Sequence, residues 1–339
     1  MPTLYGRNWT QAELQHLTGT PAQLAGIRLV EYADGKARGM RAAELWTGSG
    51  LSFTIWLDRG LDIGPAQFAG KPLAFLHPAL GTPAQYEPEG LGWLRTFGGG
   101  LLTTCGLTHF GSPDQEKGGT FGLHGRASHI PAQNVSTRAA WEGDQYWLEV
   151  AGQVQQAVIF GENLLLTRRI RTFLGASCLA IEDRLENIGF RAAPAMVLYH
   201  CNFGFPVVSP DTTLEIDDVS VAPRTEVARA GLSDHTRFSD PDPTYAEQVF
   251  FHTPRPDAGG YVTATLHNHA LGFGAYVRYR SAELPTLTQW KMMGAGEYVC
   301  GLEPCTSYLA SRQVLRQEGL IRDLQPGEHI DFRLEIGVV

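Results

Sequence analysis

Apolar and polar residues alternate along most of the chain. GIRLVEYADG, MRAAELWTGSG and LSFTIWLDRGLDIG are each bounded by glycine or aspartate, and similar alternation covers residues 145–189, 261–280 and 329–339. Alternation with a period of two places every second side chain on the same face of a strand. The pattern predicts a succession of antiparallel strands joined by turns.

Helical periodicity is rare. The clearest example starts at Thr10, which is followed three residues later by Glu13 and then by the apolar Leu14 and Leu17. Threonine and glutamate at this spacing are typical of a capping box at a helix N-terminus. We therefore expect a short helix at residues 11–17. Elsewhere strands do not alternate with helices, as they would in a parallel sheet.

The composition agrees with an all-β chain, because 39 glycines and 20 prolines suit the many turns of an antiparallel sandwich. No linker or change in composition divides the sequence, so we expect one domain spanning residues 1–339. The predicted fold is a large antiparallel β-sandwich with few short helices. The stretch SDHTRFSDPDP, residues 233–243, is interpreted as one long surface loop.

Acidic residues outnumber basic ones, 35 against 27, and the formal net charge is -8. Nucleic-acid-binding proteins usually carry a basic patch. No run of lysines or arginines occurs in this chain, so no nucleic-acid partner is expected. The densest basic spot, Arg168, Arg169 and Arg171, falls in an apparent strand and is interpreted as a solvated face.

The N-terminal sequence MPTLYGRNWTQAEL lacks the basic and apolar regions of a signal peptide, and no long apolar run occurs later. We expect a cytoplasmic protein with no membrane partner. The five cysteines are odd in number and form no C-x-x-C pair. They are therefore expected to be reduced, with neither a disulfide framework nor a zinc site. The sequence does not determine the oligomeric state, and a homo-oligomer is one of the possibilities.

Common catalytic signatures are absent: the chain has no G-x-S-x-G, G-x-x-x-x-G-K-[ST], H-E-x-x-H or G-x-G-x-x-G sequence. The first candidate is instead His124, which lies between glycines in TFGLHGRASHIP. So little side-chain bulk allows a sharp turn that brings the imidazole to a cleft. Glycines also mark ordinary turns, so this histidine alone does not establish a site.

Two further candidates lie later in the chain. In YHCNFGFP, His200 and Asn202 fall on one face of an extended segment among aromatic and apolar neighbours. The alternative for His200 is a core histidine bonded to a backbone carbonyl. In YVCGLEPCT, Glu303 ends an apolar segment directly before Pro304. Burial there would raise its pKa toward the range of a general base, and the alternative is a carboxylate at the rim.

The order and spacing of GLHG with His124, YHCNFGFP with His200 and GLEP with Glu303 resemble those of the aldose 1-epimerases, the galactose mutarotase-like proteins. The closing LQPGEHIDFRLEIGV is similar to their last strand. WLRTFGGGLLTTCGL, LDRGLDI and QWKMMGAGEYVCGLEP resemble a poorly characterised aldose 1-epimerase-like branch of that superfamily. The similarity spans nearly the whole chain.

The resemblance implies a large β-sandwich whose concave face binds a sugar. Glu303 would be the base that takes the proton of the anomeric hydroxyl, and His200 the acid that protonates the ring oxygen as the hemiacetal opens. His124 would hold the ring or share in the proton transfer. A carboxylate and an imidazole suit this chemistry near neutral pH, and no cofactor or metal is expected.

The chain departs from the family at residues that would contact the sugar. It lacks the family's N-R-I stretch and a recognisable further aspartate, so Arg95 in LRTFGGG is only a positional substitute. Asn202 and Trp290 are further binding candidates, and Trp290 would pack on the apolar face of a pyranose.

Two basic residues near these motifs bear on the charge of the substrate. Arg126 follows GLHG, and Lys291 follows Trp290. If both face the site, they would recognise an acidic or phosphorylated sugar through charge-assisted hydrogen bonds. The alternative is that they pair with Asp62 or Glu297.

The expected partner is therefore a small sugar, and the expected activity is the interconversion of anomers, or a related epimerisation, of a monosaccharide or its derivative. Two alternatives stay open. A non-catalytic carbohydrate-binding protein would keep the groove without turnover, and a carbohydrate lyase or hydrolase can use the same architecture. The two histidines and the glutamate favour catalysis, because aromatic platforms alone would serve for binding.

Overall fold

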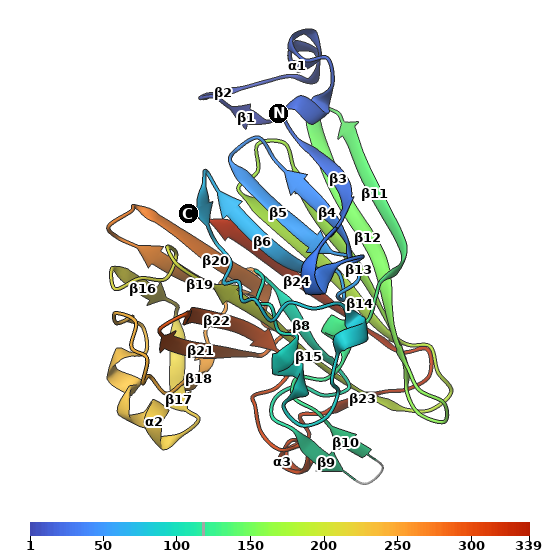
Figure 1. Ribbon diagram of the computed structural model, residues 1–339, viewed down its shortest axis with the longest axis vertical. Coiled ribbons are helices and arrows are strands. Elements are labelled where there is room, and N and C mark those ends of the chain that lie inside the picture. Colours follow the sequence, from blue (N-terminus) through green and yellow to red (C-terminus); the bar gives the residue numbers. More distant parts are fainter. Residues whose placement is uncertain (117–118) are drawn as a thin grey trace.

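The strands of the described residues form three extended antiparallel sheets and two small two-stranded sheets (Figure 1). The structure is a computed structural model and describes residues 1–116 and 119–339. It confirms the predicted all-β sandwich, because the described helices are few and short. None of these helices is long and apolar enough to cross a bilayer.

The largest sheet has eight strands, and the C-terminal strand lies in its interior. Its first four strands are consecutive in sequence and form hairpins, and the second to fourth of them lie in the stretch from residue 145 to 189 where alternation predicts strands. In spatial order the strands are β11 (Gln133–Glu142), β12 (Gln145–Ala157), β13 (Asn163–Phe173), β14 (Cys178–Asn187), β24 (His329–Val338), β20 (Phe273–Arg280), β19 (Tyr261–Asn268) and β16 (Thr212–Glu215).

The second sheet has seven strands and carries most of the candidate site residues. One of its strands, β8 (Thr103–Leu107), pairs with β15 beside the main path of the sheet. In spatial order the others are β17 (Asp218–Pro223), β18 (Gln248–Pro254), β21 (Thr286–Gly294), β22 (Glu297–Cys305), β15 (Ala193–Phe203) and β23 (Arg322–Leu324).

The third sheet is a five-stranded meander near the N-terminus. Its strands are β3 (Gly26–Glu31), β4 (Arg41–Trp46), β5 (Leu51–Trp56), β6 (Asp62–Phe68) and β7 (Lys71–Pro72). The small sheets pair β1 (Thr3–Leu4) with β2 (Arg7–Asn8), and β9 (Asp114–Glu116) with β10 (Gly119–Phe121).

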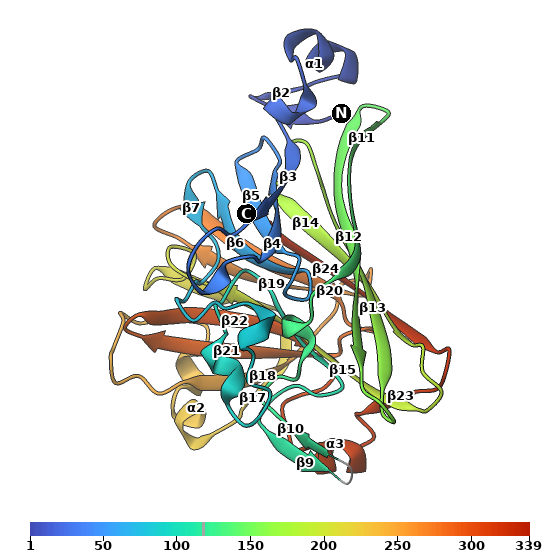
Figure 2. The same cartoon turned by 45° about the vertical axis from the view of Figure 1, so that its right-hand side comes forward.

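The helices lie at the edges of the sandwich. In Figures 1 and 2, α1 lies at one end of the molecule with β1 and β2, whereas α3 lies at the other end beside β9 and β10. The α-helices are α1 (Gln11–Leu17), α2 (Glu226–Ala230) and α3 (Arg312–Gln317). Single 3₁₀ turns occur at Pro21–Gln23, Gly35–Ala37, Pro83–Gln85, Gly92–Arg95, Ala127–His129 and Leu232–Asp234.

Helix α1 has the predicted bounds and the predicted cap. The Thr10 side chain accepts a hydrogen bond from the Glu13 backbone, and the Glu13 carboxylate accepts one from the Thr10 backbone. These reciprocal bonds satisfy two of the amide groups that a helix N-terminus leaves without partners.

The core forms where the alternating apolar side chains of the sheets meet. In β12 every second residue from Tyr146 to Gln156 is buried, and the apolar members belong to a continuous cluster with strands of all three sheets. The cysteines are free thiols, as expected, and all except Cys178 are buried.

The interpretation of Arg168 as part of a solvated face is wrong. It occupies a core-facing position in β13, between Leu166 and Ile170, and its side chain is fully buried. Its guanidinium lies 2.6 Å from Asp183 and 3.3 Å from Asp62, so the buried charge is paired. The neighbouring Arg169 and Arg171 lie on the opposite face, because adjacent residues of a strand point to opposite sides.

The stretch from Ser233 to Pro243 contains no strand, as predicted, but it is not wholly a surface loop. Phe238 is buried in the core, and the segment forms a β-bridge from Arg237 to Thr213. It therefore packs against the sheets while it connects β17 to β18.

Candidate active site

One cavity, of about 510 Å³, gathers the three residues for which the sequence predicts proton transfer, His124, His200 and Glu303. This volume falls in the range of small-molecule sites, ~300–1,000 Å³. The other lining residues are Leu91, Trp93, Leu94, Phe97, Gly111, Ser112, Leu123, Arg224, Thr225, Glu247, Val249, Thr288, Trp290 and Leu309.

His200 and Glu303 come from neighbouring strands. The register of β15 and β22 pairs Leu198 with Cys305 and Cys201 with Leu302, and it therefore sets His200 opposite Glu303. Side chains opposite each other in an antiparallel pair lie on the same face and in contact. The imidazole Nε2 lies 3.1 Å from the carboxyl Oε1, and both side chains are almost completely buried.

This close contact is not aligned as a hydrogen bond. Although the distance is that of an ion pair, Glu303 Oε1 has no hydrogen-bond partner among the described residues, and neither do His200 Nδ1 and His124 Nδ1. Buried polar atoms are nearly always paired. Three residues that line one cavity therefore each keep a buried polar atom without a partner among the described residues.

A glycine makes room for this pair. Gly301 lies two residues before Glu303 in β22, on the same face. A Cβ atom at this position would lie 2.6 Å from Glu303 Oε1 and 3.3 Å from His200 Cε1. A side chain at residue 301 would therefore displace one of the two groups.

His124 reaches the cavity from a turn with an uncommon backbone conformation. Its φ is +56°, and Gly125 follows with a φ of +73°. The His124 amide donates to Gly111 O at 2.9 Å, and its carbonyl accepts from the Gly106 amide at 3.0 Å. A Cβ at Gly125 would collide with the carbonyl oxygens of Gly106 and His109. The left-handed conformation costs roughly 1–3 kcal/mol at a residue other than glycine, and such residues cluster at functional sites.

Aromatic rings surround the two histidines. The Trp93 ring lies 4.8 Å from that of His124, and the Trp290 ring lies edge-on to His200 at 5.4 Å. Trp93 also stacks on Phe97 at 4.4 Å. The indole of Trp290 donates to Glu247 Oε2 at 2.9 Å. The cavity therefore combines apolar platforms with a few polar groups, as sugar-sized binding sites require.

Burial disfavours the charged forms of all three candidate residues. It raises the pKa of Glu303 well above its usual value; Glu247 adds to this shift and Arg224 opposes it. Burial lowers the pKa of His200 to about 4, against an opposing contribution from Asn202. It also lowers the pKa of His124 well below the usual value, with a smaller contribution from His200. Near neutral pH both imidazoles are therefore neutral.

Two charged residues at the cavity had not been expected from the sequence. Arg224, at the end of β17, donates from Nη2 to Ser112 Oγ at 2.7 Å, and Glu247 precedes β18 and holds Trp290. Both are exposed and lie on connecting segments. Their sequence surroundings are those of ordinary surface charges, so no pattern singles them out.

The structure places Arg95 and Arg126 outside the cavity lining. Arg95 is exposed and lies 3.4 Å from Glu87, with which it forms a surface ion pair. Arg126 is exposed as well and lines a different cavity, together with Tyr86 and His109. The expectation that these two arginines face the sugar therefore has no support in the geometry.

Asn202 and Lys291 also stay out of the lining. The Asn202 amide donates to the backbone carbonyls of Gly100 and His200, so it braces β15 from within the core. Lys291 follows Trp290 in β21 and therefore points to the other face of the sheet. Its ammonium donates to the Asp234 carbonyl at 2.8 Å. Among the described residues, neither Lys291 nor Arg126 forms the alternative ion pair with Asp62 or Glu297; Asp62 pairs with Arg168.

Trp93 and Phe97 lie within WLRTFGGG, part of a stretch that resembles the family, and neither was predicted to line the site. The sequence signal that could have identified them as lining residues is a pair of aromatic residues before a run of glycines. Among the described residues, one group of three side chains has the spacing of metal ligands, and it lies outside the cavity.

Comparison with known families gives one match. Residues 37–338 match the profile of DUF4432, which is described as a domain of unknown function. Comparison with curated proteins gives no match.

Solved structures confirm the predicted superfamily. A protein from Klebsiella pneumoniae subsp. pneumoniae MGH 78578, provisionally described as an aldose 1-epimerase, is 25% identical with a TM-score of 0.86, and the match covers 97% of this chain and 90% of that one. A galactose mutarotase-like protein from Clostridium acetobutylicum is 14% identical (TM-score 0.66; 94% and 99% covered). Galactose 1-epimerase from Lactobacillus acidophilus NCFM is 12% identical (TM-score 0.60; 93% and 99% covered). At these low identities the last two show the shared fold alone.

Proposed function

The chain belongs to the DUF4432 family, and we propose that it is an aldose 1-epimerase or a closely related sugar isomerase. The proposed substrate is a monosaccharide or its acidic or phosphorylated derivative. The mutarotase-like fold and the similarity to a protein provisionally described as an aldose 1-epimerase support this class of reaction. The fold alone does not specify it, because one architecture hosts several chemistries.

The observation that carries the proposal is the pairing of His200 with Glu303 at the cavity. Opening a cyclic hemiacetal requires a proton to leave the anomeric hydroxyl and another to reach the ring oxygen. A carboxyl and an imidazole in contact at one cavity, each with a polar atom that has no partner among the described residues, would supply a base and an acid for one sugar ring.

In the proposed reaction Glu303 removes the proton from the anomeric hydroxyl. The bond between the anomeric carbon and the ring oxygen breaks, and His200 donates a proton to that oxygen. Rotation about the bond between the first two carbons of the open-chain aldehyde presents its other face. Ring closure by the reverse steps then gives the other anomer and restores both side chains.

Before Glu303 can act as the base, the proton shared by Glu303 and His200 has to reside on His200. Because burial raises the pKa of Glu303 and lowers that of His200 to about 4, the neutral pair is the favoured form in the free protein. A small rotation of the imidazole would align the 3.1 Å contact and let the proton pass to His200. The resulting carboxylate and imidazolium are the base and acid of the proposed reaction, and hydrogen bonds from the bound sugar would stabilise their charges.

The other lining residues would hold the sugar. His124 is neutral and has an unpaired Nδ1, so it can bond a hydroxyl beside the reacting atoms. Trp93 and Trp290 offer apolar surfaces for the sugar ring. Arg224 is the one lysine or arginine among the described lining residues, and Glu247 offsets its charge.

The proposal is tested by NMR with a panel of neutral, acidic and phosphorylated sugars. Saturation transfer identifies those that bind, and exchange spectroscopy measures the rate at which their anomers interconvert. The proposal predicts at least one sugar whose anomers exchange faster with the protein than in buffer. A sugar that binds while its exchange rate stays at the buffer value would instead indicate a carbohydrate-binding protein.

A further inference from the structure

A second group of titratable residues lies behind the cavity. In β21, Thr288 and Trp290 line the cavity, so Gln289 between them points to the opposite face of the sheet. There Gln289 contacts His252 of β18 and the backbone of His235.

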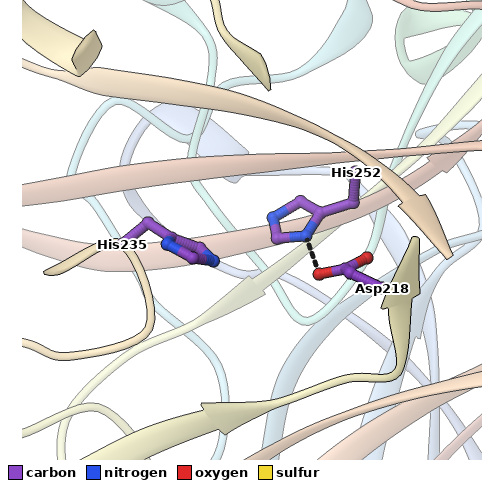
Figure 3. Close-up of side chains that lie close together, drawn as sticks. All are labelled: Asp218, His235 and His252. Carbon is purple, nitrogen blue, oxygen red and sulfur yellow. Dashed lines mark hydrogen bonds and ion pairs between the residues drawn. The ribbon is translucent and has the colours of Figure 1, made fainter. Parts of the chain in front are cut away.

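The group comprises Asp218 in β17, His235 in the segment between the strands, and His252 in β18. Each offers one ligand atom, and these atoms lie within 4.8 Å of one another. Figure 3 shows the three side chains pointing toward one another from separate parts of the chain. We propose that Asp218, His235 and His252 bind a divalent transition metal such as Zn²⁺.

The hydrogen bonds of the two histidines fit this role. His235 Nδ1 lies 2.7 Å from the Leu232 carbonyl, so it carries the proton and leaves Nε2 with a lone pair. His252 Nε2 lies 3.1 Å from Gln289 Oε1. Metal-binding histidines commonly donate their second ring N–H to such an oxygen, which fixes the orientation of the ring.

Gln289 itself is oriented by a second bond. Its amide nitrogen donates to the His235 carbonyl at 2.7 Å, so the amide oxygen faces His252 as an acceptor. His252 Nε2 is therefore the donor, and Nδ1 is the atom available to a metal. His252 Nδ1 lies 2.7 Å from Asp218 Oδ2, and a hydrogen bond joins the two atoms through one proton (Figure 3). A metal ion would replace this proton.

The ligand types indicate the class of metal. Two imidazoles and one carboxylate suit Zn²⁺, Co²⁺ or Fe²⁺, whereas Ca²⁺ and Mg²⁺ prefer oxygen ligands. Asp218 Oδ1 is buried and has no partner among the described residues, so the carboxylate has unused acceptor capacity. His252 is buried, but Asp218 and His235 are partly exposed and leave a path for a metal to enter.

One nearby charge opposes a cation. The Lys291 ammonium is bound to the carbonyl of Asp234, the residue before His235. Its repulsion weakens the attraction of Asp218 for a metal. Removal of this charge by Lys291→Gln is therefore expected to tighten metal binding, whereas loss of any of the three ligands is expected to weaken it.

A metal at this position would connect two strands that adjoin the cavity wall with the segment that lies between them in sequence. Asp218 lies in the strand that leads to Arg224 and Thr225, and His252 lies in the strand that follows Glu247. His235 belongs to the segment between these strands. Metal binding would therefore order the segment from 224 to 247, independently of any reaction in the cavity. The proposal does not rest on the proposed sugar chemistry.

The test is a titration of the full-length, metal-free protein with Co²⁺, whose visible absorption reports nitrogen and oxygen ligands. We expect one equivalent to bind, and Zn²⁺ to displace it. His235→Gln and Asp218→Asn should remove this binding, and Gln289→Leu should weaken it roughly 10- to 100-fold by freeing the His252 ring. Circular dichroism verifies the fold of each variant.

A matched control separates this site from adventitious binding. His267 and His269 form a more exposed pair of rings 4.7 Å apart in and just beyond β19. His269→Ala should leave the titration unchanged. If His269→Ala removes the Co²⁺ signal, or if His235→Gln and Asp218→Asn both keep it, the proposed site is wrong; wild-type protein that binds no Co²⁺ overturns it as well.

Hydrogen exchange gives a second readout that needs no substrate. Zn²⁺ should increase amide protection in the segment from 224 to 247 of the wild type, and not in His235→Gln. The Zn²⁺ concentration should be one that fully displaces bound Co²⁺, so that the site is saturated. Equal protection with and without Zn²⁺ under this condition would contradict the structural role proposed for the metal.

Discussion

His200 and Glu303 are cross-strand neighbours whose side chains meet at one cavity, with imidazole Nε2 3.1 Å from carboxyl Oε1. They are far apart in sequence, and the pairing of β15 with β22 brings them together. Both lie on strands of a large sheet, so the sandwich holds them in place more firmly than loops would.

Gly301→Ala tests whether the proposed anomer exchange depends on the space beside His200 and Glu303. The new methyl group would lie 2.6 Å from Glu303 Oε1, so the carboxyl or the His200 ring must move. Because a displacement of about 1 Å can cost roughly 100-fold in rate, we expect a loss of roughly 10- to 100-fold in anomer exchange with little change in sugar affinity. Exchange spectroscopy measures the rate. Gly19→Ala, at a position with no atom within 4 Å, is the control and should exchange at the wild-type rate.

Trp290→Ala tests the proposed sugar platform. Loss of the indole removes apolar surface from the cavity and the bond to Glu247. We expect sugar affinity to fall about fivefold, since an aromatic contact is worth about 1 kcal/mol beyond simple burial. Titration calorimetry with a sugar identified by the NMR panel measures this change. Unchanged affinity would exclude Trp290 from the binding surface.

Asp183→Asn tests the buried ion pair between Arg168 and Asp183. Arg168 donates to both carboxylate oxygens of Asp183, and Tyr199 donates to one of them. Removal of one buried charge leaves the other poorly compensated, so the free energy of unfolding should fall by about 3–5 kcal/mol. The exposed neighbour Arg169 provides the control, because Arg169→Gln should change the free energy of unfolding by less than about 0.5 kcal/mol. Urea unfolding measures both.

His129 makes stability depend on pH. Burial, with a smaller contribution from Arg59, lowers the pKa of this histidine to about 2. An unfolded histidine titrates near pH ~6.5, so the stability that depends on neutral His129 is complete above that pH and is lost as the pH falls. Between pH 6.5 and 5 the loss in the free energy of unfolding is about 1.6 kcal/mol, because half of the unfolded-state histidines are already protonated at pH 6.5.

His129→Gln should remove this part of the pH dependence. The variant starts less stable, because His129 bonds Thr96 and Ser128, but its free energy of unfolding should fall less between pH 6.5 and 5 than that of the wild type. Urea unfolding at several pH values gives both curves. Parallel curves would show that His129 does not stay neutral in the folded protein.

The sequence predicts the fold well because alternation and turn residues are local signals. The capping box at Thr10 and the alternation of β12 and β13 reappear in the structure. Arg168 is an exception: its charge indicated a solvated position, although its place in the alternation of β13 indicated the core. Its partner Asp183 comes from the next strand, so only the pairing of β13 with β14 reveals why the charge can be buried.

The candidate site was predictable only in part. The glycines around His124 correctly indicated a sharp turn, and the family resemblance pointed to His200 and Glu303. Lys291 could have been excluded once Trp290 was placed in the site, since adjacent residues of a strand face opposite ways. Arg224 and Glu247 could not be found, because they lie on connecting segments whose position depends on the packing of the whole sandwich.

The most direct test of the proposed function is anomer exchange by Glu303→Gln, measured by NMR on a sugar that the wild type binds and interconverts. The amide is nearly isosteric but cannot take a proton, so we expect exchange to fall roughly 10²–10⁴-fold while sugar affinity stays within about threefold. Glu247→Gln, which alters the cavity's exposed carboxylate, should keep most of the exchange rate. If Glu303→Gln binds the sugar and exchanges its anomers at the wild-type rate, Glu303 is not the base and the proposed mechanism is wrong.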